Sequence, residues 1–240
     1  MKAEGLSAPA VAKLNGLVER YHMSESQRAQ LEAILLALAV DERSPTAVRG
    51  PAQALDVHLA DSLVALGVEA VGRAERIADL GAGAGFPGLA LAVAIPDAEL
   101  RLVESQARKC AFMGGLLARA GVANARVVCA RAEEWREGLG ANDVVLARAL
   151  AAPAVVVEYA APLLRVGGVL VEWRGRREPE RERLGLDAAR QLGIDLTEIR
   201  RVEPYEGARD HHLHIYLKSR GTPSGFPRRA GMARKRPLAR

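Results

Sequence analysis

A glycine-rich stretch carries the most specific chemistry in this sequence of 240 residues. It runs from Ile77 to Gly88, reads IADLGAGAGFPG, and lies between an apolar run and a helical pattern. Gly81, Gly83 and Gly85 allow positive φ angles, so the backbone can approach a ligand closely. The following helix would point the free N–H groups of its N-terminus at the same ligand. We therefore expect this turn to bind a nucleotide or a nucleoside.

Two ligand classes compete for this turn. The dinucleotide fingerprint G-x-G-x-x-G, counted from Gly81, requires a glycine where Phe86 stands; counted from Gly83, it leaves Gly81 unexplained. The D-x-G-x-G-x-G turn of S-adenosylmethionine enzymes matches from Asp79 without a gap. Asp79 would then lie near the ammonium and the sulfonium of the ligand. The spacing favours S-adenosylmethionine and leaves a nicotinamide dinucleotide as the weaker alternative.

Residues at the ends of the next two expected strands also indicate that the ligand contains a nucleoside. Glu104 ends the second strand, where both ligand classes use an acid to hold ribose hydroxyls. Ala132 and Glu133 follow the third strand, where an adenine would meet backbone and side-chain partners. Glu104 therefore indicates a nucleoside without choosing one, and the Ala132–Glu133 pair adds a weaker signal.

The loop after the fourth expected strand offers no general base. Arg148 is the only ionisable residue in its LARALAAP segment, and an arginine stays protonated, so it can orient a substrate or hold a cofactor carboxylate. The absence of a base fits a nucleophile that loses no proton when it is methylated. Guanine N7 is such a nucleophile, because it has a lone pair and no proton, and its methylation needs only proximity and orientation. His58, His211, His212 and His214 are candidate bases from elsewhere, although structural roles are commoner for such histidines.

The pattern of elements places these residues in an α/β fold. Residues 1–70 read as helices, and Ser24 with Gln27 forms a capping-box signature. From Ile77 onward short apolar strands alternate with helices, which predicts a doubly wound, mostly parallel sheet. Two closing strands flank the loop Pro204–Asp210 and predict an antiparallel edge. We expect an N-terminal helical segment packed on the core (1–70), a methyltransferase domain (71–218) and a flexible basic tail (219–240).

The formal net charge of +5 is concentrated at the C-terminus. Eight basic residues and no acid lie between Lys218 and Arg240. Such a tail indicates a polyanionic partner, with a disordered solubilising end as the alternative. The two cysteines form no disulfide framework and have no nearby ligand companions, so no metal site is expected. The lack of a signal-peptide pattern and of a membrane-length apolar run predicts a cytoplasmic protein.

Several motifs in order resemble the RsmG family, also called glucose-inhibited division protein B. They are IADLGAGAGFPGLALA, VESQARKCAFM, ARAEEW, LARALA and HHLHIYLK, together with HLADSL and the arginine-rich tail. The resemblance covers residues 55–240. It implies a class I, Rossmann-like S-adenosylmethionine-dependent enzyme that methylates guanine N7 in bacterial 16S rRNA. It also implies cofactor contacts from Gly81, Phe86, Ala132, Glu133 and Arg148, to which the residue patterns above add Gly83 and Glu104.

The departures from the family pattern lie on the substrate side. The N-terminal region lacks the Trp-Asn and Asn-Leu-Thr motifs, and Arg174–Gly175 replaces a Lys-Gly pair after the fifth strand. Arginine and lysine differ in hydrogen-bond geometry. We expect Arg148, Arg174 and the tail to orient the base or bind phosphates of 16S rRNA or the small ribosomal subunit, with the protein a monomer. A methyltransferase for another RNA or a small molecule, and a non-catalytic RNA-binding assembly factor, stay as alternatives.

Overall fold

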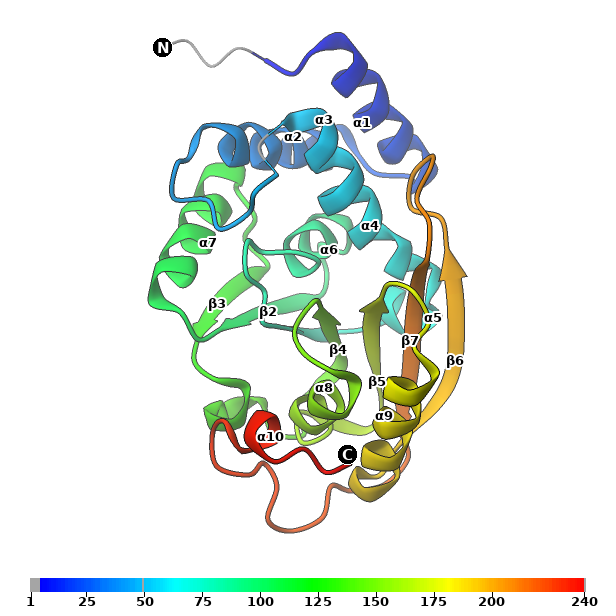
Figure 1. Ribbon diagram of the computed structural model, residues 1–240. Coiled ribbons are helices and arrows are strands. Elements are labelled where there is room, and N and C mark those ends of the chain that lie inside the picture. The colour runs from blue at the N-terminus through cyan, green and yellow to red at the C-terminus, as the bar shows by residue number, and fades with distance from the viewer. Residues whose placement is uncertain (1–4, 49, 240) are drawn as a thin grey trace.

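Seven strands form one mixed sheet within residues 5–48 and 50–239, which the computed structural model describes (Figure 1). Their order across the sheet is β3-β2-β1-β4-β5-β7-β6. The first five are parallel, and β7 runs antiparallel to both β5 and β6. The strands are β1 (Arg76–Leu80), β2 (Glu99–Glu104), β3 (Ala125–Cys129), β4 (Asn142–Arg148), β5 (Leu164–Arg174), β6 (Ile194–Val202) and β7 (His211–Lys218). The predicted parallel sheet with an antiparallel edge is confirmed.

Helices cover both faces of the sheet (Figure 1). One layer holds α1, α2, α6 and α7, and the other holds α8, α9 and the short α10. Along β2, Leu100 and Leu102 face the first layer and Val103 faces the second, because successive side chains of a strand alternate between faces. The helices are α1 (Ala8–Arg20), α2 (Glu25–Val40), α6 (Gly88–Ala94), α7 (Ala107–Ala120), α8 (Pro153–Ala160), α9 (Pro179–Leu192) and α10 (Met232–Lys235).

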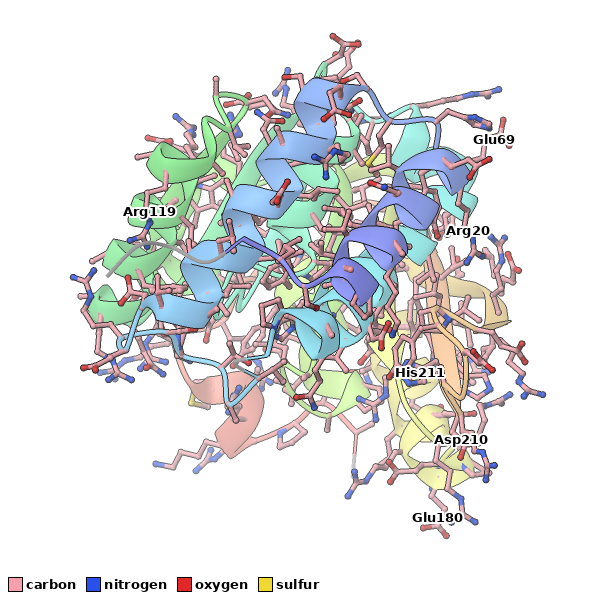
Figure 2. The ribbon with its side chains drawn as sticks, turned by 90° about the horizontal axis from the view of Figure 1, so that it is seen from above. Arg20, Glu69, Arg119, Glu180, Asp210 and His211 are labelled. Carbon is pink, nitrogen blue, oxygen red and sulfur yellow. The ribbon has the colours of Figure 1, made fainter. Side chains whose placement is uncertain are left out.

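The N-terminal helices α1 and α2 form the outer part of the first layer, where α2 packs against α6 and α7 (Figure 2). The predicted capping box at the start of α2 is confirmed: the Ser24 hydroxyl accepts from the Gln27 N–H at 3.3 Å, and the Gln27 side chain accepts from the Ser24 N–H at 2.7 Å. Gln27 Nε2 also donates to the Val93 carbonyl of α6 at 2.8 Å. This one side chain therefore caps α2 and ties it to the helix that follows the glycine-rich turn.

A helical run of mixed type connects α2 to β1. It consists of α3 (Pro51–Ala54), the π-helical turn η1 (Leu55–Ala60), α4 (Asp61–Leu63), the 3₁₀ turn η2 (Val64–Gly67) and α5 (Glu69–Gly72). The spacing of Leu55, Leu59, Leu63 and Leu66 at three to four residues predicts a continuous helix, and the π turn is the departure from it. Single π turns often occur at functional sites, because they redirect side chains and carbonyls.

Residues 219–239 lie against the second helical layer. Arg228 binds both carboxylate oxygens of Glu158 in α8, with Nε–Oε1 at 2.6 Å and Nη2–Oε2 at 2.5 Å. Lys218 is buried and donates to the Leu192 carbonyl at 2.7 Å. The sequence predicted a flexible basic tail, whereas part of its charge is used to fix the chain to the domain. The domain limits at residues 70 and 218 stay a prediction.

Across the described ranges, the helices are all too short or too polar to cross a membrane.

Candidate functional site

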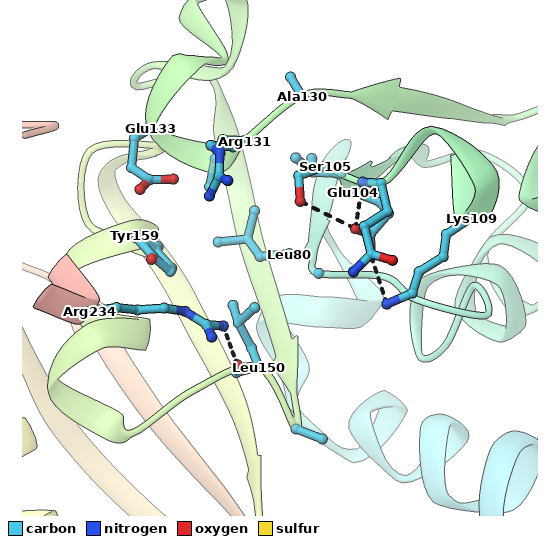
Figure 3. Close-up of a pocket in the computed structure, with 15 residues that line it drawn as sticks. Leu80, Glu104, Ser105, Lys109, Ala130, Arg131, Glu133, Leu150, Tyr159 and Arg234 are labelled. Atoms are coloured by element: carbon cyan, nitrogen blue, oxygen red, sulfur yellow. Dashed lines mark hydrogen bonds and ion pairs between the residues drawn. The ribbon is translucent and has the colours of Figure 1, made fainter. Parts of the chain in front are cut away.

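A cavity of about 500 Å³ opens at the carboxyl ends of the parallel strands (Figure 3). Ligands bind at this edge in doubly wound folds, because the loops that follow the strands converge there. The lining residues come mainly from the loops after β1, β2, β3 and β4, with additions from α7, α8 and α10. They are Leu80, Gly81, Val103, Glu104, Ser105, Gln106, Lys109, Ala130, Arg131, Ala132, Glu133, Ala149, Leu150, Tyr159 and Arg234. The structure thus brings together Gly81, Glu104, Ala132 and Glu133 of the predicted set.

The glycine-rich turn has the backbone conformation that its sequence predicts. Gly81, Gly83 and Gly85 have φ angles of +67°, +60° and +104°. The side chain of Leu150 packs over Gly81, so a Cβ atom added there would lie 2.6 Å from Leu150 Cδ1. Gly83 does not itself line the described cavity, but its N–H donates to Glu104 Oε2 at 3.3 Å. A side chain at position 81 would therefore strain the turn and displace Leu150, which lines the cavity.

Asp79 lies behind the turn and is absent from the described lining of the cavity, contrary to the expected position beside the ligand. Its side chain is 1% exposed, and Oδ2 accepts the Gly88 N–H at 2.8 Å. Burial raises the pKa of Asp79 to about 7, against the lowering effects of the Gly88 N–H and of the Arg148 charge. A Cβ atom at Gly88 would come within 2.9 Å of this carboxylate. Asp79 therefore fixes the start of α6 against β1.

Glu104 is held rigidly at the end of β2. Oε1 accepts the Gln106 N–H at 2.9 Å, and Lys109 Nζ lies 3.8 Å from Oε2. The residue is only 6% exposed, yet it lines the cavity (Figure 3). A carboxylate fixed by backbone donors can accept further hydrogen bonds, and ribose hydroxyls are suitable donors. Its predicted place at the sugar-binding position is thus compatible with the geometry.

Ala132 and Glu133 lie in the short turn η3 (Ala132–Glu134), which follows β3. Both line the cavity. Glu133 also has a contact that the sequence did not predict: Oε1 accepts the N–H of Gly231, in the C-terminal segment, at 2.8 Å. The side of the cavity where the adenine is expected is therefore bordered by residues from the end of the chain.

Arg148 and Phe86 lie outside the described lining of the cavity, beside the helical run. Arg148 Nη1 donates to Asp61 Oδ2 at 2.7 Å and to the Val57 carbonyl of the π turn at 3.1 Å. The Phe86 ring stacks on His58, with centroids 4.7 Å apart and planes 5° apart. His58 and Asp61 of the HLADSL motif thus hold Phe86 and Arg148 in place. Any contact of these two residues with a cofactor must be compatible with this packing.

Asp61 is the centre of this cluster. The residue is 6% exposed, and its Oδ1 also lies 3.1 Å from Nδ1 of His211, at the start of β7. Its carbonyl accepts Trp173 Nε1–H from β5 at 2.8 Å. The helical run is therefore tied to β4, β5 and β7 through one residue.

The histidines considered as bases are placed in structural positions. His58 Nε2 lies 3.1 Å from Thr46 Oγ1, and burial with the nearby Arg148 charge lowers the pKa of His58 to about 4. His212 Nδ1 lies 3.0 Å from the Gly175 carbonyl, and burial lowers the pKa of His214 to about 4. Like His211, they lie outside the described cavity lining.

Arg174 lies at the end of β5 and is not among the residues that line the described cavity. Its Nη1 donates to the Ala151 carbonyl at 3.2 Å and lies 3.4 Å from Glu172 Oε1. Glu172 is 2% exposed and pairs across the strands with His214 of β7. A buried carboxylate thus holds Arg174 toward the loop after β4.

The pKa of Glu172 predicts a pH-dependent effect on stability. Burial raises this pKa to about 7, against the lowering effect of Arg174, so the folded state binds the proton more tightly than the unfolded state. The stabilising contribution is therefore present below the unfolded pKa and is lost as the pH rises through about 7. The variant Glu172→Gln does not titrate at this position, so the wild type loses stability relative to it as the pH rises. The free energy of unfolding of the variant minus that of the wild type should be about 2 kcal/mol larger at pH 8 than at pH 4.5. Urea unfolding of both proteins at the two pH values measures this difference. The same difference at pH 4.5 and pH 8 would contradict a raised pKa for Glu172.

Sequence reasoning missed several cavity residues. Ser105, Gln106, Ala130, Arg131 and Ala149 directly follow strand ends, and that position alone could have identified them. Leu150 packs over the turn, and Ala149 has a φ of +52°. No pattern in the sequence predicts either feature. Tyr159 and Arg234 come from α8 and α10, so only the tertiary fold brings them to the cavity (Figure 3).

Comparisons with solved structures agree on the fold. The methyltransferase SibL in its apo form superposes with a TM-score of 0.56 and 15% identity, over 88% of this chain and 74% of that chain. Fibrillarin from Aeropyrum pernix, solved with bound S-adenosyl-L-methionine, gives a TM-score of 0.52 and 21% identity, over 66% of this chain and 74% of that chain. The fold is that of the class I methyltransferases.

Sequence comparisons are more specific. Residues 27–201 match the family model GidB, described as rRNA small subunit methyltransferase G. The Ribosomal RNA small subunit methyltransferase G of Rubrobacter xylanophilus is 38% identical over 90% of this chain and 85% of its own length. That of Carboxydothermus hydrogenoformans is 31% identical over 95% and 99%, respectively. The resemblance inferred from the motifs is confirmed, and the chain belongs to the rRNA small subunit methyltransferase G family.

Proposed function

We propose that the protein transfers the methyl group of S-adenosylmethionine to N7 of a guanine in 16S rRNA, as a cytoplasmic monomer. The observation that carries the proposal is the cavity in which Glu104 faces the loops after β3 and β4, next to the glycine-rich turn. The family relationship and the class I fold support the same activity.

The donor and acceptor groups of the cavity fit this cofactor. Glu104 offers a fixed carboxylate to the ribose hydroxyls. Gly81 lines the cavity with a positive φ angle, and we propose that its backbone contacts the methionine part. The small side chain of Ala132 and the backbone of Glu133 leave room for the adenine. We propose these residues, with Gly83 acting through its hydrogen bond to Glu104, as the cofactor site.

The reaction requires little acid–base chemistry from the protein. Bound S-adenosylmethionine supplies an electrophilic methyl group, which the N7 lone pair accepts as the carbon–sulfur bond breaks, with no proton lost. The ionisable residues in the described lining already have other partners or are cations; Glu104 and Glu133, for example, accept backbone N–H groups. The contribution of the chain is therefore to hold both reactants in line and to exclude water.

Arg148 and Arg174 are proposed to orient the target base. Toward the residues that the structure describes, Arg148 donates through Nη1, and its other donors are proposed to contact a ligand at the loop after β4. Asp61 and the Val57 carbonyl fix the direction of this guanidinium. Arg174, held by Glu172 and Ala151, lies beside the same loop and would contact the base or a phosphate. Phe86 is proposed to support the turn through its stacking on His58.

The test uses purified protein, cofactor labelled in the methyl group, and 16S rRNA from cells that lack this activity, both free and in small subunits. We expect label in N7-methylguanine and in no other nucleoside. Label in another base or in a small molecule would contradict the guanine assignment, and binding of rRNA without any transfer would favour the assembly-factor alternative.

A further inference from the structure

The C-terminal strap, residues 226–236, is attached to the body of the protein at three points. The first is the ion pair between Arg228 and Glu158, and Glu158 is only 3% exposed. A bidentate pair with a buried carboxylate is strong and geometrically specific. Arg228 Nη2 also donates to the Arg236 carbonyl at 2.9 Å, so the same side chain closes the strap on itself. This anchor fixes the strap across α8.

The other two points lie at the cavity itself. The Gly231 N–H donates to Glu133 Oε1 at 2.8 Å, and Gly231 has a φ of +81°, a conformation that favours glycine. Arg234 Nη2 donates to the Leu150 carbonyl at 2.8 Å. Glu133 and Leu150 both line the cavity, and Leu150 packs over Gly81. The strap is therefore bonded to two loops that form the cavity, those after β3 and β4.

Arg234 is itself part of the cavity wall. Figure 3 shows it beside Tyr159, on the side opposite Glu104. Burial raises the pKa of Tyr159, and the adjacent Arg234 opposes that rise. With the ribose at Glu104 and the base toward Glu133, a nucleoside would extend across the cavity toward this pair. A guanidinium plane stacks well on an aromatic ring, and Tyr159 adds an aromatic surface beside it.

We propose that the C-terminal strap is a component of the cofactor site and that Arg234 contacts the adenine of S-adenosylmethionine. This inference rests on the proposed function, because it takes the cofactor and its orientation from it. The tail then has two groups of cations with different tasks. Arg228 and Arg234 build the cofactor site, whereas Arg229, Lys235 and Arg236 are exposed and remain available to RNA phosphates.

The proposal changes the meaning of a tail deletion. If the tail only bound RNA phosphates, an enzyme that acts on a small molecule would lose little on removal of residues 219–240. With the strap in the cavity wall, the deletion weakens cofactor binding whatever the methyl acceptor is. Single substitutions within the intact strap are therefore the informative variants.

The direct test compares Arg234→Ala with Lys235→Ala in the full-length protein. Both positions are exposed and adjacent in α10, but only Arg234 lines the cavity. Isothermal titration calorimetry with S-adenosylmethionine and with S-adenosylhomocysteine should give about tenfold weaker binding for Arg234→Ala and wild-type binding for Lys235→Ala. Circular dichroism checks that both variants fold. Wild-type affinity in Arg234→Ala, or an equal loss in both variants, would overturn the proposal.

Limited trypsin digestion gives a second readout that does not depend on activity. Saturating S-adenosylhomocysteine should protect the bonds after Arg229 and Arg234 in the wild type, because a bound nucleoside holds the strap in place. Unchanged cleavage of the strap at saturation would contradict the inference. If the wild type binds the cofactor and forms N7-methylguanine while Arg234→Ala binds equally well, only this inference fails. If the wild type binds no S-adenosylmethionine, the proposed function fails with it.

Discussion

Replacement of Asp61 by asparagine is expected to lower the free energy of unfolding by about 3 kcal/mol. The Asp61 carboxylate binds Arg148 Nη1 at 2.7 Å and lies 3.1 Å from His211 Nδ1 in a largely buried setting. The amide keeps the size of the side chain but leaves the Arg148 charge without its partner. Urea denaturation at pH 7 measures the loss. Methyl transfer should fall as well, because Arg148 loses its fixed direction.

Asp56→Asn is the matched control for this prediction. Asp56 lies in the same helical run and binds Lys13 Nζ at 2.6 Å, but 52% of the Lys13 side chain is exposed. Exposed ion pairs contribute up to about 1 kcal/mol, so this variant should unfold close to the wild type. Equal losses in the two variants would show that the buried cluster around Asp61 has no special role in the stability of the fold.

The replacement Glu104→Gln should weaken binding of S-adenosylmethionine by about 10- to 100-fold. The charged carboxylate accepts N–H groups from Gln106 and Gly83 and faces the cavity. An amide accepts more weakly, and its NH₂ group would face one of these donors. Both the ribose contact and the position of the glycine-rich turn would suffer. Calorimetric titration with the cofactor measures the affinity without any rRNA substrate.

Glu99→Gln provides the comparison on the same strand. Glu99 begins β2, at the opposite edge of the sheet, and its partners are the largely buried Arg101 and the exposed Arg126. Its cofactor affinity should match that of the wild type. A Glu104→Gln protein that also binds with wild-type affinity would remove Glu104 from the cofactor site, and with it the proposed orientation of the ligand.

The sequence identified four residues that meet at the cavity, because local rules determine their positions. A glycine pattern, a strand end and a short turn each lie within a few residues of the chain, and the parallel order of β1 to β4 brings them to one edge. Gly81, Glu104, Ala132 and Glu133 meet at the cavity for this reason. Which of these residues touches the cofactor stays a prediction, to be tested by the variants above.

The sequence could not predict contacts that depend on packing between distant segments. Asp79 matches a ligand-binding motif, yet its carboxylate turns toward Gly88 and is buried, since the α6 N-terminus lies against β1. Arg148 is held by the π turn, and the leucine spacing of that segment predicted an ordinary helix. Arg234 reaches the cavity in a C-terminal segment that the ion pair between Arg228 and Glu158 fixes to the second helical layer. The count of basic residues in the tail could not distinguish Arg228 and Arg234 from the other cations there.

The most direct measurement of the central claim is the mass-spectrometric analysis of nucleosides from 16S rRNA in cells that lack this gene. The account predicts that N7-methylguanine is lost from 16S rRNA, that the wild-type gene restores it, and that the Glu104→Gln gene restores much less. An unchanged amount of N7-methylguanine in the 16S rRNA of these cells would contradict the account.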